Sequence, residues 1–264
     1  MSAVLPAGRL FDELKALGLA RGDRVFVHSS LRAVGQVAGG PDMVAKSLLS
    51  VVGPSGLVVA PTFTYDNPTF DPVRTPGRTG ALAEALRAWP GAVRSLHPFY
   101  SVAAVGAGAA ELCEGHHLVA GTAPGSPLDR LATGGGKVLL IGTGHTSNTT
   151  IHVGEFHAEV GYLDIPFDPG WPTGATVELG DGRSLEVSYD RFPGCSRAFG
   201  AIERSLRQRG AIRDGQIGRA LAQLVSGRAI VEEAVVLLRA DEAALLCTDP
   251  GCFRCSRARA RLQR

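Results

Sequence analysis

A histidine and a carboxylate stand three residues apart in a polar segment of this chain. His152 and Glu155 follow Thr149, and residues 142–149 consist of Gly, Ser, Thr, Asn and one His. Residues three apart share a face of an α-helix, so Glu155 can orient the imidazole of His152 and increase its basicity. The pattern predicts a general base that removes a proton. The alternative is an ion pair on a helix surface.

The residues before this segment predict its place in a fold. The apolar run 137–142 has the composition of a buried β-strand, and Ser147, Asn148 and Thr149 are residues that favour the start of a helix. Open α/β sheets bind ligands at the carboxyl ends of their strands. We therefore expect the site at this strand end. A zinc hydrolase is a poor alternative, because neither His-Glu-x-x-His nor its inverted form occurs.

Three cysteines near residue 250 have a spacing typical of metal ligands. Cys247, Cys252 and Cys255 form C-x4-C-x2-C, and Cys195 is a possible fourth ligand. The spacing resembles half of a structural zinc site, and the alternative is a group of free thiols. Five cysteines in this arrangement fit a reducing compartment better than a disulfide framework.

The composition excludes several classes of protein. The chain has 264 residues, 45% of them hydrophobic, and a formal net charge of +2, with no basic stripe. A sizeable core can form, so disorder is excluded, and no nucleic-acid partner is expected. No apolar run reaches the roughly 20 residues of a membrane span, and the first predicted helix is charged, unlike a signal peptide. We expect a cytoplasmic protein that does not associate with membranes.

Strands and helices alternate up to about residue 160. This alternation predicts an α/β fold with a mixed, largely parallel central sheet flanked by helices. The long Pro-rich stretch 65–80 is expected to be a binding loop. We interpret 1–264 as one domain in which 165–264 is a C-terminal elaboration that completes the substrate site. The predicted strands are 23–28, 56–64, 97–106 and 137–142, the predicted helices are 5–19, 43–52 and 81–88, and the elaboration contains a hairpin of 174–179 and 183–189, helices at 196–208 and 216–224, and a strand at 234–238.

A series of motifs in a fixed order resembles a known family. The series spans roughly residues 10 to 165 and is far more specific than any one of its motifs. It is similar to the aminoglycoside 3-N-acetyltransferases, also called antibiotic N-acetyltransferases, which are distinct from the GNAT superfamily. The motifs are Val27-His28-Ser29-Ser30-Leu31, Pro61-Thr62-Phe63-Thr64, Thr75-Pro76-Gly77-Arg78-Thr79-Gly80-Ala81-Leu82, His97-Pro98 with Ser101, Ser126-Pro127-Leu128, and Asn148-Thr149-Thr150-Ile151-His152 followed by Glu155.

The resemblance implies that the acetyl group of acetyl-CoA is transferred directly to an amine, without an acyl-enzyme. His152 matches the family's catalytic histidine, Glu155 its partner, and Thr149 a threonine that we interpret as the oxyanion donor. The expected partners are acetyl-CoA and an amine-bearing small molecule, and the protein is expected to be a monomer or a homodimer. The residues that by resemblance hold CoA are Ser29, Ser30, Leu31, Arg78, Thr79 and Ser101.

The acceptor is expected to be an aminoglycoside, by resemblance at its 3-amino group, or a related amine. Because aminoglycosides are polycations, acidic residues are expected near the acceptor, and Glu159 and Asp190 are the predicted contacts. Asp164 and Asp168 are further acids in this region. The string Thr75-Pro76-Gly77-Arg78-Thr79 and the turn 142–148 depart from the family pattern, which leaves another amine metabolite as an alternative acceptor. The alternative outside enzymes is a protein that sequesters a CoA ester or an amine drug.

Overall fold

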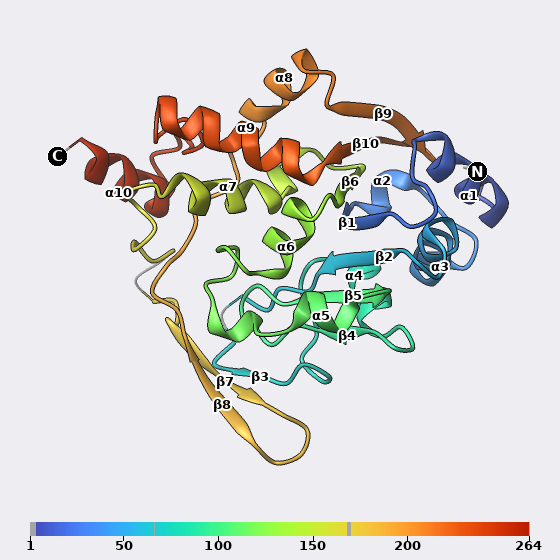
Figure 1. Cartoon of the computed structure of the whole chain (residues 1–264), viewed down its shortest axis with the longest axis horizontal. Coiled ribbons are helices and arrows are strands. Elements are labelled where there is room, and N and C mark those ends of the chain that lie inside the picture. Colours follow the sequence, from blue (N-terminus) through green and yellow to red (C-terminus); the bar gives the residue numbers. More distant parts are fainter. Residues whose placement is uncertain (1–3, 66, 168–169, 264) are drawn as a thin grey trace.

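A seven-stranded mixed sheet forms the centre of the computed structural model, which describes residues 4–65, 67–167 and 170–263. Its strand order is β4-β5-β2-β1-β6-β10-β9 (Figure 1). The three central strands are parallel, with Phe26 opposite both Val59 and Val138, and the outer strands pair antiparallel. The predicted mixed α/β sheet is confirmed, with its parallel part at the centre. The strands are β1 (Arg24–Ser29), β2 (Leu57–Pro61), β4 (Val93–Arg94), β5 (Val102–Gly106), β6 (Lys137–Ile141), β9 (Ile212–Ile217) and β10 (Ala220–Ser226).

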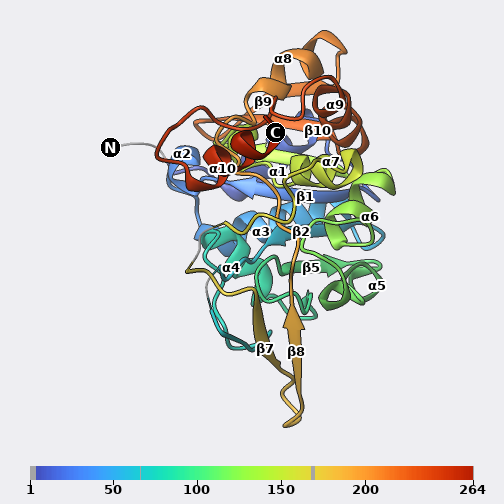
Figure 2. The ribbon, with the colours of Figure 1, turned by 90° about the vertical axis from the view of Figure 1, so that its left-hand side faces the viewer.

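Helices cover both faces of this sheet (Figure 2). The central strands are apolar without alternation, as strands buried on both faces must be, and every residue of β2 is buried. One core lies under α1 (Ala7–Ala16), α2 (Leu31–Val34), α3 (Gly40–Val52) and α4 (Ala81–Arg87). The other lies under a second group of helices, namely α5 (Ala109–Cys113), α6 (Pro127–Thr133), α7 (Thr150–Ala158), α8 (Ala201–Gln208), α9 (Gly227–Ala240) and α10 (Phe253–Leu262). None of the described helices is both long and apolar enough to cross a membrane.

A small second sheet extends away from the main one (Figure 2). The predicted hairpin is confirmed as β7 (Gly174–Glu178) and β8 (Ser184–Ser188), and β7 also pairs with β3 (Thr69–Phe70) from the long loop after β2. The inward-facing side chains Phe70, Val177 and Val187 belong to a mostly aromatic core beneath this sheet. The loop after β2 is therefore anchored at its middle.

Two predicted elements in the last third are wrong. Residues 216–224 are not a helix, because β9 and β10 form a hairpin there that turns at Gly218, whose φ of 60° suits glycine. Residues 234–238 are not a strand, because they lie within α9. The buried side chains of that helix include Ile230, Val231, Ala234 and Leu238, a spacing that follows the helical period. β10 pairs with β6, so the last third of the chain completes the main sheet.

Candidate active site

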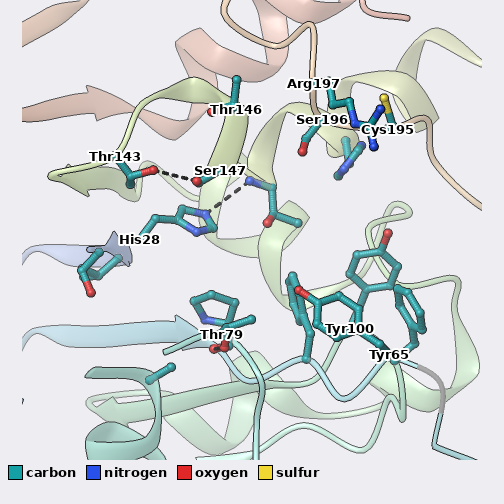
Figure 3. Close-up of a pocket in the computed structure, with 18 of the residues that line it drawn as sticks. His28, Tyr65, Thr79, Tyr100, Thr143, Thr146, Ser147, Cys195, Ser196 and Arg197 are labelled. Atoms are coloured by element: carbon teal, nitrogen blue, oxygen red, sulfur yellow. Dashed lines mark hydrogen bonds between the residues drawn. The ribbon is translucent and has the colours of Figure 1, made fainter. Parts of the chain in front are cut away.

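A cavity of about 560 Å³ opens where the parallel strands end (Figure 3). It lies beyond the carboxyl ends of β1, β2 and β6, the edge at which open α/β sheets bind ligands. Its volume suits a small molecule or part of a cofactor. The lining residues are Val27, His28, Ser29, Ser30, Pro61, Phe63, Tyr65, Thr79, Leu82, Ala83, Phe99, Tyr100, Thr143, Thr146, Ser147, Thr149, His152, Phe167, Trp171, Gly194, Cys195, Ser196 and Arg197.

The predicted pair of His152 and Glu155 lies at this cavity. Both residues are in the first two turns of α7, and the imidazole Nδ1 lies 2.6 Å from Oε2 of Glu155. His152 lines the cavity while Glu155 is fully buried behind it. A carboxylate is an acceptor only, so Nδ1 carries the proton and the Nε2 of a neutral imidazole is free to accept one. The pair has the arrangement of a base with an orienting carboxylate and is not a surface ion pair.

The Glu155 carboxylate is held by two further donors. The Tyr162 hydroxyl donates to Oε1 at 2.7 Å, and the Gly194 N–H lies 3.1 Å from each oxygen. Burial raises the pKa of Tyr162 well above its ordinary value, and the neighbouring carboxylate raises it further, so the phenol stays a donor. These contacts fix the carboxylate in one orientation. Sequence reasoning missed both residues, since neither is near Glu155 in a recognisable motif.

Thr149 lies at the start of α7 and lines the cavity. Its side chain makes no capping hydrogen bond, and the Thr150 N–H is instead accepted by Asn148 Oδ1 at 3.2 Å. The Thr149 N–H donates to Nε2 of His28 at 3.3 Å (Figure 3). Burial lowers the pKa of His28 to about 3, so this imidazole is neutral and accepts the bond. The sequence motif that contains His28 predicts no role for this residue. Its position at the end of β1, the edge where ligands bind, could have indicated that it lies at the cavity.

The residues predicted to hold CoA fall into two groups. Ser29, Ser30 and Thr79 line the cavity. The other three, Leu31, Arg78 and Ser101, are not among its lining residues. Leu31 packs against the core under α1 to α4, and Arg78 is exposed and donates to Asn67 Oδ1 at 3.4 Å.

The Ser101 hydroxyl is used inside the protein. It is fully buried, donates to the Thr62 carbonyl at 2.8 Å and lies 3.2 Å from Nε of Arg94. Arg94 also donates to the carbonyl of Thr62 at 2.7 Å and to that of Thr75. Ser101 therefore supports the base of the loop after β2.

The predicted acidic contacts lie outside the cavity lining. Glu159 is exposed and ends α7, with a left-handed φ of 54°, at the opposite end of the helix from the cavity. Asp190 is also exposed, and Asp164 pairs with Arg261 at 3.1 Å on the surface. Asp168 lies outside the described residues. Among the residues that the structure describes, the cavity lining contains no carboxylate.

Aromatic side chains form one wall of the cavity. Tyr65, Phe99, Phe167 and Trp171 contact one another, with ring centroids between 5.4 and 6.4 Å apart. Such rings offer flat apolar surface and a negative face that attracts cations. Composition gave no hint of this wall, because only 6% of the residues are aromatic.

The four predicted cysteine ligands meet at the edge of the cavity. The sulfur atoms of Cys195, Cys247, Cys252 and Cys255 all lie within 4.8 Å of one another, and the Cys255 thiol donates to the Cys195 sulfur at 3.2 Å. That bond is the main reason the pKa of Cys195 is lowered, to about 5. Cys195 also lines the cavity.

The chain matches a model of a known protein family. A family model described as aminoglycoside 3-N-acetyltransferase matches residues 26–239, which is most of the chain. The chain belongs to this family. The family resemblance expected from the motifs is thereby confirmed, and the match includes His28, the His152–Glu155 pair and the cavity-lining segment 194–197.

Curated members of the family match over most of their length. Aminoglycoside N(3)-acetyltransferase IV of Salmonella sp is 32% identical over 95% of this chain and 94% of its own. Aminoglycoside N(3)-acetyltransferase VII of Streptomyces paromomycinus is 36% identical over 86% of this chain and 89% of its own.

Solved structures of family members share the fold. The apoenzyme of aminoglycoside acetyltransferase AAC(3)-IVa superposes with a TM-score of 0.88 at 31% identity, covering 99% of both chains. The family member AAC-IIIb, solved as a binary complex with CoASH, gives a TM-score of 0.78 at 30% identity over 90% of this chain and 97% of its own. A histidine-to-alanine mutant of AAC(3)-IVa in complex with a gentamicin gives 0.87 at 31% identity over 99% of both chains.

Proposed function

We propose that this protein transfers the acetyl group of acetyl-CoA to an amino group of an aminoglycoside, the 3-amino group by family resemblance. The observation that carries the proposal is the buried pair of His152 and Glu155 at the cavity. Nδ1 of the His152 imidazole lies 2.6 Å from Oε2 of the Glu155 carboxylate. Family membership supports the reaction, and the complexes of relatives with CoASH and with a gentamicin support the two substrates.

His152 acts as the general base. The acceptor amine reacts in its neutral form, and its nitrogen forms a bond to the thioester carbonyl carbon while Nε2 of His152 removes one proton from that nitrogen. When the tetrahedral intermediate collapses, the C–S bond breaks, and the proton on His152 goes to the leaving CoA thiolate. Glu155 stabilises the imidazolium that forms in between, because it faces Nδ1 throughout. Holding both substrates in one cavity supplies the proximity that direct transfer needs.

The Thr149 hydroxyl is the proposed donor to the oxyanion. Its backbone N–H already donates to His28, so that group is not available, whereas the hydroxyl makes no capping bond. A donor aimed at the developing negative charge is worth about 10²–10³ in rate in other acyl-transfer sites. Thr149 also precedes His152 by about one helical turn, and both residues line the cavity, which supports their acting on the same carbonyl.

The substrates are proposed to meet between two different surfaces. Ser29, Ser30 and Thr79, at the ends of β1 and before α4, supply polar contacts for the pantetheine part of CoA. The aromatic wall with Tyr65 and Trp171 supplies a face for the acceptor, since ammonium groups and the apolar faces of sugar rings both pack on aromatic rings. Glu159 and Asp190 are exposed and do not line the cavity, so this acceptor face does not include them.

Measuring thiol release from acetyl-CoA with a panel of aminoglycosides tests the function. His152→Ala is expected to lower kcat by at least about 100-fold, the usual loss when a general base is removed. His157→Ala is the matched control, since His157 lies on the same helix, outside the cavity lining, and bonds to Asp129 at 2.8 Å. The control is expected to stay within about threefold. Full activity of His152→Ala, or saturable binding of acetyl-CoA and amine with no thiol released, contradicts the proposal.

We further propose that the four cysteines bind a structural zinc ion. Thiolate sulfur is a preferred zinc ligand, and four sulfurs within 4.8 Å can surround one ion, since tetrahedral Zn–S bonds of about 2.3 Å require only small adjustments. A bound ion would crosslink Cys195 to the C-terminal residues Cys247, Cys252 and Cys255.

Metal analysis of purified protein tests the zinc site. One equivalent of zinc is expected, and Cys247→Ser is expected to lose most of it. Cys113→Ser is the matched control, because Cys113 is buried elsewhere and its thiol donates a hydrogen bond to the Val93 carbonyl at 3.7 Å. Less than about half an equivalent in the wild type contradicts the site.

A further inference from the structure

One short segment, residues 192–197, serves the catalytic carboxylate, the cavity wall and the cysteine cluster together. The Gly194 N–H contacts both oxygens of Glu155 at 3.1 Å. The next residue, Cys195, belongs to the cluster, and Ser196 and Arg197 line the cavity beside it (Figure 3). Cys195 and Gly194 are neighbours across one peptide, with Cα atoms about 3.8 Å apart, so a shift of the Cys195 backbone acts directly on the Gly194 position.

The segment 192–197 is closely packed against Glu155. A Cβ at Gly194 would lie 2.6 Å from Oε1 of Glu155 and 3.3 Å from Leu246. Both neighbours are buried, and the carboxylate is bonded on its other sides. Close packing transmits displacement, whereas a loose contact absorbs it.

Helix α10 holds the same segment through a second contact. Arg254, which is 2% exposed, donates from Nε to the Pro193 carbonyl at 2.9 Å and from Nη2 to the carbonyls of Phe192 and Tyr162, the latter at 3.0 Å. Arg254 fixes residues 192 and 193, but no described side chain other than the three cysteines bonds to the Cys195 sulfur. The ion pair of Arg197 with Asp249 also holds this side of the segment, but its side chains are 60% and 46% exposed and such surface pairs contribute little. The cluster is thus the main anchor on the cavity side of Gly194.

We propose that metal binding at the four cysteines positions the catalytic base, by fixing Cys195 and with it the Gly194 N–H that orients Glu155. This inference rests on the zinc site and the general base proposed above. Without an ion, the Cys195 side chain is held in the cluster by S–H contacts such as that from Cys255 at 3.2 Å, and S–H is a weak hydrogen-bond donor. Cys195 then moves out of the cluster, the Gly194 N–H leaves the carboxylate, and His152 loses its fixed orientation. Acetyl transfer slows although substrate, base and fold are all present.

A thermodynamic cycle separates this coupling from general stabilisation. Zinc is removed with a chelator in the presence of a non-thiol reductant, in the wild type and in Glu155→Gln, and kcat is measured by thiol release at a temperature where all four species are folded. Metal removal is expected to lower kcat at least about tenfold in the wild type but less than about twofold in Glu155→Gln, because that variant has already lost the oriented carboxylate. Readdition of zinc alone is expected to restore the wild-type rate. An equal loss in both backgrounds overturns the proposal.

Amide hydrogen exchange at Gly194 provides a readout that does not depend on turnover. In the wild type, exchange at this amide is expected to accelerate at least about tenfold after metal removal, whereas the amide of Ala103 in β5 stays protected. Unchanged protection at Gly194 overturns the coupling even if Glu155→Gln proves inactive.

The failures of the three proposals are distinguishable. Absence of zinc from purified protein defeats the metal site, and full activity of His152→Ala defeats the base. If zinc is bound but its removal lowers kcat equally in the wild type and in Glu155→Gln, only this inference is contradicted.

Discussion

Adding one methyl group at Gly194 is the most direct perturbation of the catalytic pair. The new Cβ of Gly194→Ala would lie 2.6 Å from Oε1 of Glu155, whereas ordinary van der Waals contact begins near 3.4 Å. The carboxylate must withdraw by about 0.8 Å, which is enough to carry a bond of 2.7 Å beyond the usual hydrogen-bond range. The side chain has no space to retreat into, since it is fully buried.

The expected cost follows from the bonds at risk. A hydrogen bond to a charged group contributes about 1.5–3 kcal/mol, and 1.36 kcal/mol corresponds to a tenfold change in rate. We therefore expect Gly194→Ala to lower kcat by about 10- to 100-fold. Overpacking of this kind also lowers the free energy of unfolding by about 1–3 kcal/mol. Thiol release measures the first quantity and urea unfolding the second.

Gly200→Ala is the matched control, because a Cβ at Gly200 meets no heavy atom within 4 Å and the residue has an ordinary helical φ of −57°. We expect its kcat to stay within about twofold of the wild type, with stability unchanged or slightly higher. The reasoning is refuted if folded Gly194→Ala has a kcat within about threefold of that control. In that case the orientation of Glu155 would not limit the reaction.

Three further outcomes follow from the same contacts. Tyr162→Phe removes a donor at 2.7 Å from Glu155 and should lower kcat about 3- to 10-fold, whereas Tyr189→Phe, which removes a buried hydroxyl without a partner, should leave kcat and stability unchanged in the same assays. Burial lowers the pKa of His28 and of His116 to about 3 in the folded protein, whereas a histidine in the unfolded chain has a pKa of about 6.5. Below about pH 6.5 the unfolded chain therefore binds more protons at these two positions than the folded protein does. Their stabilising contribution is complete above that value and is lost as the pH falls from about 6.5 to 3. Urea unfolding should therefore show each of them costing about 2 kcal/mol at pH 5 relative to pH 7, and a flat profile would refute the burial argument. Trp171→Ala should raise KM for the aminoglycoside about tenfold with a smaller change in kcat, and a selective change in KM for acetyl-CoA would instead assign the aromatic wall to CoA.

The parts of the site encoded over a few residues were predictable from sequence. His152 and Glu155 are one helical turn apart, so their proximity needed only a helix. Glu159 is seven residues beyond His152, which moves its side chain about 10 Å along the helix. It therefore lies outside the cavity lining, and a contact with the acceptor stays a prediction.

The parts that depend on distant segments were not predictable. Gly194 reaches Glu155 only because α7 and the segment 192–197 pack together, and no local pattern encodes that contact. Tyr162 reaches Glu155 because the chain turns back after the end of α7. The wrong helix at 216–224 and the wrong strand at 234–238 have a related cause. Both segments are short, and pairing with β6 in the first and packing of α9 in the second decide the structure rather than intrinsic propensity.

The grip of α10 on residues 192 and 193 has a consequence for the order in which the site matures during synthesis. A nascent chain that has grown to residue 250 already contains the base, its carboxylate and every described strand of the sheet. It lacks Arg254 and two of the four cysteines, so neither of these restraints yet acts on the segment that orients Glu155. Helix α10 is synthesised after every described strand, so it adds the last restraints on the segment that holds the Gly194 N–H against Glu155.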